Sequence, residues 1–187
     1  MKHSLLENLY IKRFCLPCNT DITKLISSFG HKSLLVTSNS YNHIAFVFEQ
    51  GKIVLNNNEL FMTKTDDNII SYGINSYGDI DGKHPGIHAE IDAINRLPNF
   101  RNKHNAKHNK QINLFITRIS KIAKIQNSKP CNSCIQKMKY LSNLKGYKIR
   151  RIYYTDDIGN IVRTNLDNLA SEPQHYSLYY RNKLLKL

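Results

Sequence analysis

Short stretches rich in apolar and β-branched residues recur along the chain, separated by polar or glycine-containing segments. This pattern is typical of strands joined by turns. It predicts strands over residues 44–49, 53–55, 69–72, 112–119, 150–155 and 161–164. Residues 112–119 alternate apolar and polar side chains and form the clearest of these strands. Residues 50–52 include a glycine and predict a turn between the first two segments.

Two later segments carry apolar residues at helical spacing. Residues 88–97 predict a helix that ends before Pro98, with an apolar stripe at Ile87, Ile91, Ile94 and Leu97. Residues 131–145 predict a second helix, which Gly146 can cap, with a stripe at Ile135, Met138, Leu141 and Leu144. Weaker helical patterns occupy residues 21–30 and 171–187.

Strands and helices alternate through the middle of the chain, which predicts a sheet covered by helices, an α/β layered fold. A length of 187 residues fits a single domain. We expect its core over residues 20–165, with an N-terminal extension over 1–19 and a C-terminal helix or tail over 166–187. Residues 156–160 predict a hairpin turn, which would make the last two strands antiparallel.

The chain carries 27 lysines and arginines against 14 acidic residues, a formal net charge of +13. Such a charge attracts polyanions and favours nucleotides or nucleic acids as partners. Solubility alone is the alternative explanation, since net charge does not specify a fold.

The cysteines form two pairs with two residues between the members of each, Cys15/Cys18 and Cys131/Cys134. Residues 1–10 do not resemble a secretory signal, so we expect a reducing compartment, cytoplasm or nucleus, rather than secretion. We expect no membrane association, because the purest apolar stretch, 44–48, is far shorter than the roughly 20 residues that span a bilayer.

Two short motifs carry the chemistry: His88-Ala89-Glu90 and Pro130-Cys131-Asn132-Ser133-Cys134. Each lies at the start of a predicted helix. Cysteines at positions i and i+3 project from one face, and a helix N-terminus favours the thiolate form that binds metals. One imidazole and two thiolates would leave the fourth position of a tetrahedral zinc ion open to water. Glu90 would lie beside that water and move its protons.

These motifs, His-x-Glu followed by Pro-Cys-x-x-Cys, resemble the signature of the cytidine deaminase-like zinc hydrolases. The resemblance covers roughly residues 44–165 and implies a three-layer α/β/α domain with a mixed five-stranded sheet and extra N- and C-terminal elements. It implies that His88, Cys131 and Cys134 bind Zn²⁺ while Glu90 is catalytic. The implied reaction is hydrolytic deamination of cytosine to uracil, in a nucleoside, nucleotide or nucleic acid, by attack of zinc-bound hydroxide.

Four further residues are candidate substrate contacts: Asn75, Tyr77, Ala89 and Lys129. Gly73-Ile74-Asn75 resembles the Gly-x-Asn of many relatives, in which the amide contacts sugar or base, although Asn75 also suits a turn. Tyr77 would stack on a base or simply pack. Ala89 lies between the metal ligand and the catalytic carboxylate.

Two segments lengthen the interval between the motifs, residues 99–111 and 120–129. The first follows the end of the His88 helix, so we expect it on the side away from the metal. The second leads into the Pro130 turn and should border the site. Lys129 and its basic neighbours would therefore meet a phosphate, unless they form an ordinary solvated loop.

Other functions stay open. The substrate could be adenine in RNA, or the domain could be an inactive, zinc-stabilised module that binds single-stranded nucleic acid. Relatives are frequently oligomeric, which allows a homo-oligomer. Cys15 and Cys18 would be reduced and partly buried, or would form a second zinc site with His3 or His31.

Overall fold

The computed structural model describes residues 14–15, 42–50, 53–56, 59–62, 69–76, 86–100, 109–120, 125–173 and 176. The helix predicted over 21–30 and the helix predicted in the tail involve residues outside the described ranges. The second zinc site suggested for Cys15 and Cys18 also requires Cys18, which lies outside them. Within these ranges, no helix has the length and apolarity needed to cross a membrane.

The main sheet is mixed, as the sequence predicted. Its strand order is β5 (Ile69–Ile74), β2 (Asn42–Glu49), β6 (Lys110–Ile119), β8 (Tyr147–Thr155) and β9 (Ile161–Thr164), with the short β7 (Ile125–Gln126) paired to β6. The β6/β8 pair is parallel and the other pairs are antiparallel. The antiparallel β8/β9 pair confirms the predicted hairpin, and its turn contains Gly159 at a φ of 90°.

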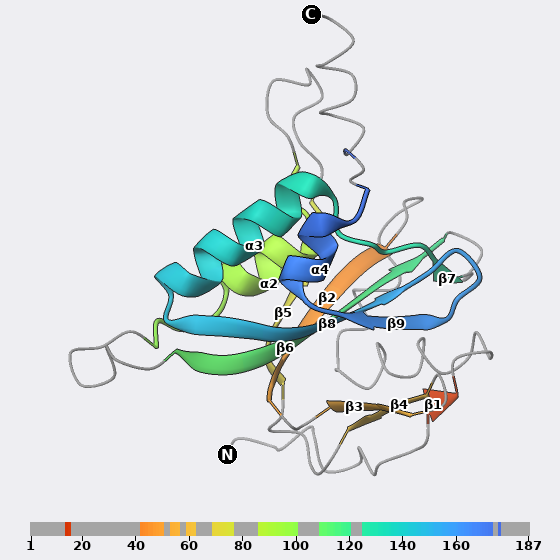
Figure 1. The fold of residues 1–187 in the computed structure, drawn as a ribbon, viewed down its shortest axis with the longest axis horizontal. Coiled ribbons are helices and arrows are strands. Elements are labelled where there is room, and N and C mark those ends of the chain that lie inside the picture. The colour runs from red at the N-terminus through yellow and green to blue at the C-terminus, as the bar shows by residue number, and fades with distance from the viewer. Residues whose placement is uncertain are drawn as a thin grey trace, which may run out of the picture.

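A second, smaller sheet consists of β1 (Phe14–Cys15), β4 (Glu59–Met62) and β3 (Ile53–Asn56). The strand predicted over 53–55 is present, but it pairs with β4 and not with β2. In Figure 1 this sheet lies on the side of the main sheet away from the labelled helices.

Three helices, α2 (Ala89–Asn95), α3 (Asn132–Leu144) and α4 (Leu166–Ser171), lie on one face of the main sheet (Figure 1). Since β5 and β6 are both antiparallel to β2, they run parallel to each other, so α2 and α3 each connect two parallel strands. The β5–α2–β6 and β6–α3–β8 connections have the same handedness and advance in the same direction across the sheet, so both helices lie on the same face of the sheet. They also bring both helix N-termini to the same edge of the sheet, beyond the carboxyl ends of the parallel strands.

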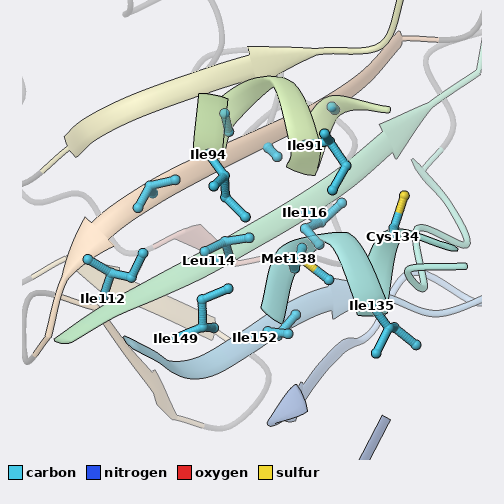
Figure 2. Close-up of a cluster of buried hydrophobic side chains, with 14 of the residues drawn as sticks. Ile91, Ile94, Ile112, Leu114, Ile116, Cys134, Ile135, Met138, Ile149 and Ile152 are labelled. Carbon is cyan, nitrogen blue, oxygen red and sulfur yellow. The ribbon is translucent and has the colours of Figure 1, made fainter. Parts of the chain in front are cut away.

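The main core fills the space between these helices and the sheet (Figure 2). Burial of each large side chain there contributes roughly 1.5–3 kcal/mol. Helix α2 supplies Ile91 and Ile94, and α3 supplies Ile135 and Met138, all of them buried. The fold class α/β is thus confirmed, with helices on one face of the sheet in the described ranges.

The two predicted apolar stripes are wrong at their ends. Ile87 is 46% exposed, because α2 begins only after its N-cap His88 and helical spacing does not extend to the residue before it. Leu144 is 55% exposed. It follows Ile135 by about two and a half turns at 3.6 residues per turn, which puts it on the opposite face of α3.

The alternation of apolar and polar residues predicted along β6 does not correspond to one buried and one exposed face. Ile112, Leu114 and Ile116 join the core below the helices, but Asn113 and Thr117 on the other face are equally buried. The cause is its central position between β2 and β8, where both faces of the sheet are covered.

Helix α2 has only seven residues, so its stability depends on packing against β5. A Cβ built on Gly73 of β5 would lie 2.1 Å from the Ala93 nitrogen and 2.3 Å from the Ala89 oxygen. The backbones of strand and helix therefore meet with no side chain between them. Two bonds fasten the contact: the Ser71 hydroxyl donates to the Ala93 carbonyl at 2.7 Å, and the Asp92 carboxylate accepts from the Ile74 N–H at 3.0 Å.

We expect Gly73→Ala to push α2 off the sheet and to destabilise the protein by about 3 kcal/mol or more, which thermal unfolding would measure. Gly159→Ala is a matched control. A Cβ there meets only the Ile125 side chain, at 3.9 Å, so its cost is the strain of a positive φ, about 1–2 kcal/mol. Only Gly73→Ala should also weaken metal binding, because α2 carries His88. Equal losses in stability, with metal binding intact in both, would contradict this account.

Candidate metal centre

The convergence of two helix starts forms the site. His88 is the N-cap residue of α2 and Cys131 is the N-cap residue of α3, both with extended backbone. Neither side chain caps its own helix, so both remain available to a ligand. Cys134 lies in the first turn of α3, at one end of the apolar core (Figure 2). Both cysteines are only 3% exposed.

The ligand atoms of His88, Cys131 and Cys134 all lie within 4.8 Å of one another. His88 Nδ1 is 3.1 Å from Cys134 Sγ and 3.7 Å from Cys131 Sγ. Tetrahedral angles at ordinary Zn–S and Zn–N bond lengths would separate sulfur from nitrogen by roughly 3.6 Å. The three side chains can therefore hold one metal ion, as the sequence predicted, and this donor set is typical of zinc.

Without a metal, contacts among these three groups shift their pKa values. A hydrogen bond from the Cys134 thiol, followed by the contact with His88, lowers the pKa of Cys131 to about 4. The same bond, together with burial, raises the pKa of Cys134. The hydrogen bond to Cys131 also raises the pKa of His88. A cation that binds all three must displace the protons of Cys134 and His88, so its affinity should rise with pH.

Glu90, in the first turn of α2, is 1% exposed. Neither of its carboxylate oxygens has a hydrogen-bond partner among the described residues. Its charge and its proximity to the Cys134 thiol both add to the rise in the pKa of that thiol, although the contact does not have hydrogen-bond geometry. A buried carboxylate left without partners costs several kcal/mol, and the helix N-terminus offsets only part of that. The carboxylate thus fits a site completed by groups from outside the chain.

The segment that leads into Cys131 is held by a buried pair of hydroxyls, which the sequence did not reveal. Ser128 Oγ donates to the Ile116 carbonyl at 2.8 Å and accepts from the Thr155 N–H at 2.8 Å. Thr155 Oγ1 donates to the Gln126 carbonyl at 2.7 Å. These bonds tie the turn to the ends of β6 and β8, which fixes where α3 begins.

The structure places the predicted substrate contacts as follows. Asn75 directly follows β5 and is partly buried, and its N–H donates to the His43 carbonyl at 3.0 Å. Ala89 is fully buried at the start of α2. Lys129 Nζ pairs with Glu172 Oε2 at 2.6 Å, so its ammonium group already has an acidic partner. Tyr77 lies outside the described residues.

The two long connections can be placed at their described ends. Phe100 N–H donates to the Lys145 carbonyl, and Lys110 N–H donates to the Gly146 carbonyl, both at 2.9 Å. These contacts lie at the C-terminal end of α3, away from the metal ligands. The start of the connection after β6 instead shares the ligand end of the sheet, as its topology predicted.

His43, at the start of β2, is a site residue that sequence reasoning missed. The charges of Glu90, His88, Arg118 and Cys131 all affect its pKa, so it lies near the metal ligands. No motif marks a histidine that precedes an apolar strand, and only the pairing of the strands brings it to the site.

Comparison with protein-family models, curated proteins and solved structures finds no match for this chain.

Zinc should bind to the purified protein and raise its melting temperature. Saturation at 100 times Kd stabilises by about 2.7 kcal/mol, which corresponds to about 5–10 °C for a domain of this size. Cys134→Ala should abolish both the shift and the bound ion. Cys18→Ala provides the control, because it removes a thiol from outside this group. If Cys134→Ala kept the ion and the shift while Cys18→Ala lost both, the site would be elsewhere.

Proposed function

We propose that this protein is a zinc-dependent hydrolytic deaminase that converts cytosine to uracil in a nucleoside, nucleotide or nucleic acid. The single observation that carries the proposal is the buried, unpartnered carboxylate of Glu90 beside three potential ligands of one metal ion. The order of the two motifs and their resemblance to the cytidine deaminase-like hydrolases supply the reaction class.

A purely structural zinc site would not need Glu90. Structural sites are usually closed by four protein ligands, whereas this group offers three in the part of the chain that is described. A buried polar group that weakens the fold is expected where function requires it. These two features favour an enzyme over an inactive zinc-stabilised module.

The reaction consumes one water and releases one ammonia. The water oxygen bonds to C4 of the base, and the bond from C4 to its exocyclic amine breaks. A bound zinc ion would supply acidity to the attacking water, so that it reacts near neutral pH. Glu90 would accept a proton from that water, pass it to the ring nitrogen, and protonate the departing amine.

The net charge of +13 favours a phosphate-bearing substrate, either a nucleotide or a single-stranded nucleic acid. Adenine in RNA is the second candidate substrate, since the same chemistry at C6 of adenine uses the same metal and carboxylate.

Glu90→Gln should reduce ammonia release from the best substrate by about 10²–10⁴-fold, because it removes the group that moves protons. Zinc content should stay unchanged, and the metal-free variant should melt at a higher temperature, because an uncompensated buried charge is gone. A panel of nucleosides, nucleotides, single-stranded DNA and tRNA would supply the substrate. Undiminished release by Glu90→Gln would refute the assigned role, and no release by wild type from any substrate would refute the proposed reaction.

Salt should separate polymer from monomer substrates. For a nucleic acid, kcat/KM should fall steeply as salt increases, with a slope of about −0.7 per phosphate contact on a logarithmic plot for single strands. For a free nucleoside, kcat/KM should barely change. A shallow dependence with every active polymer would argue against phosphate contacts as a source of affinity.

A further inference from the structure

One row of polar residues crosses three neighbouring strands at the metal end of the sheet. In the β2/β6 register His43 pairs with Arg118, and on the other side the Asn75 N–H donates to the His43 carbonyl. Asn75, His43 and Arg118 therefore lie side by side on β5, β2 and β6 or directly beyond their ends. The next residues along each strand on the same face are Gly73, Ala45 and Ile116.

Strand alternation places this row on the helix-covered face. On β2, Ala45 and Val47 belong to the core below the helices, so His43 has the same orientation. On β6, Ile116 belongs to the same core, so Arg118, two residues further on, lies on the same helix-covered face. His43 is thus a polar residue at the end of an otherwise apolar face, next to the starts of α2 and α3.

The imidazole of His43 is incompletely satisfied. Its Nε2 atom is buried and has no hydrogen-bond partner within the described ranges. Burial lowers its pKa, which Glu90 only partly counteracts, so the ring is neutral at neutral pH and offers one donor and one acceptor. Glu90 exerts the largest charge effect on His43, yet no hydrogen bond joins them. Two unsatisfied groups, one neutral and one acidic, therefore border the same metal site.

We propose that His43 determines substrate specificity by hydrogen bonding through Nε2 to the ring edge of the nucleobase. This inference rests on the proposed function for the identity of the ligand. A base edge carries donors and acceptors together, so it can satisfy a neutral imidazole and a carboxylate at once. An apolar ligand would leave both unsatisfied.

A matched control lies one residue from the Arg118 pairing position. Thr117 is fully buried, and its hydroxyl also has no partner in the described part of the chain. It pairs with Ile44, next to His43, but projects to the opposite face of the sheet. His43→Phe and Thr117→Val each remove an unsatisfied buried polar group at the same level of the sheet, and only the first faces the metal site.

Both variants should melt at a higher temperature than wild type, because each removes a buried polar group that has no partner. Only His43→Phe should raise KM, by about tenfold, with a smaller change in kcat, as expected for a lost hydrogen bond to bound substrate. His43→Gln should recover part of the loss, since an amide can donate or accept in place of the ring. Zinc content, measured for each variant, should match wild type.

Binding is measured separately from turnover, with cytidine and cytidine monophosphate as probes and zinc-loaded Glu90→Gln protein as the host. Loss of probe binding on adding His43→Phe, but not Thr117→Val, would support the inference even if wild type released no ammonia. An unchanged KM and unchanged probe binding in His43→Phe would overturn it while leaving the proposed deamination intact. A lower melting temperature for His43→Phe, or no probe binding by the host, would also overturn it.

Discussion

The direct contact between the backbones of β5 and α2 fixes the position of the site. Because residue 73 has no side chain, the strand approaches the Ala89–Ala93 turn of the helix closely enough that a methyl group would overlap it. The same helix begins at His88 and carries Glu90 in its first turn. His88 and Glu90 are therefore held by the packing of a helix on a strand, which fixes their positions more precisely than a loop would. The other two ligands depend in the same way on α3, whose start is tied to β6 and β8 by Ser128 and Thr155.

The apolar core and the site contribute to the free energy of unfolding with opposite signs. Between the helices and the sheet, residues such as Ile94, Ile116 and Met138 are fully buried and stabilise the fold. At one edge of the same layer, Glu90 and His43 bury polar atoms that find no partner among the described side chains. Each such atom costs free energy. Asn113 and Thr117 bury further atoms without a partner in the described ranges on the other face of β6, so what distinguishes Glu90 and His43 is their position beside three side chains that could hold a metal ion. This position indicates a place where the protein is complementary to something it binds.

Sequence reasoning selected the three side chains that could hold a metal ion, and Glu90 beside them, because each motif is local: i, i+2 and i, i+3 spacings at helix starts need no knowledge of the rest of the chain. It also found α2, α3, the five longer strands of the main sheet and the β8/β9 hairpin, whose signals lie within short windows, but not α4 or β7. Features that depend on long-range pairing escaped it. His43 reaches the site only through the register of β2 with β6, β3 pairs with β4 instead of β2, and Lys129 meets Glu172 from 43 residues away. The exposed Leu144 shows a different limit, since a repeat of three drifts around a helix of 3.6 residues per turn.

The account depends most on one ion held by one imidazole and two thiolates, with its fourth position open beside Glu90. X-ray absorption at the zinc edge measures this coordination directly, on protein in which Cys15 and Cys18 are replaced by serine. The account predicts two sulfur ligands at about 2.3 Å and two nitrogen or oxygen ligands at about 2.0–2.1 Å, one of the latter being exchangeable with solvent. A shell without sulfur, or one closed by four protein ligands, would contradict it.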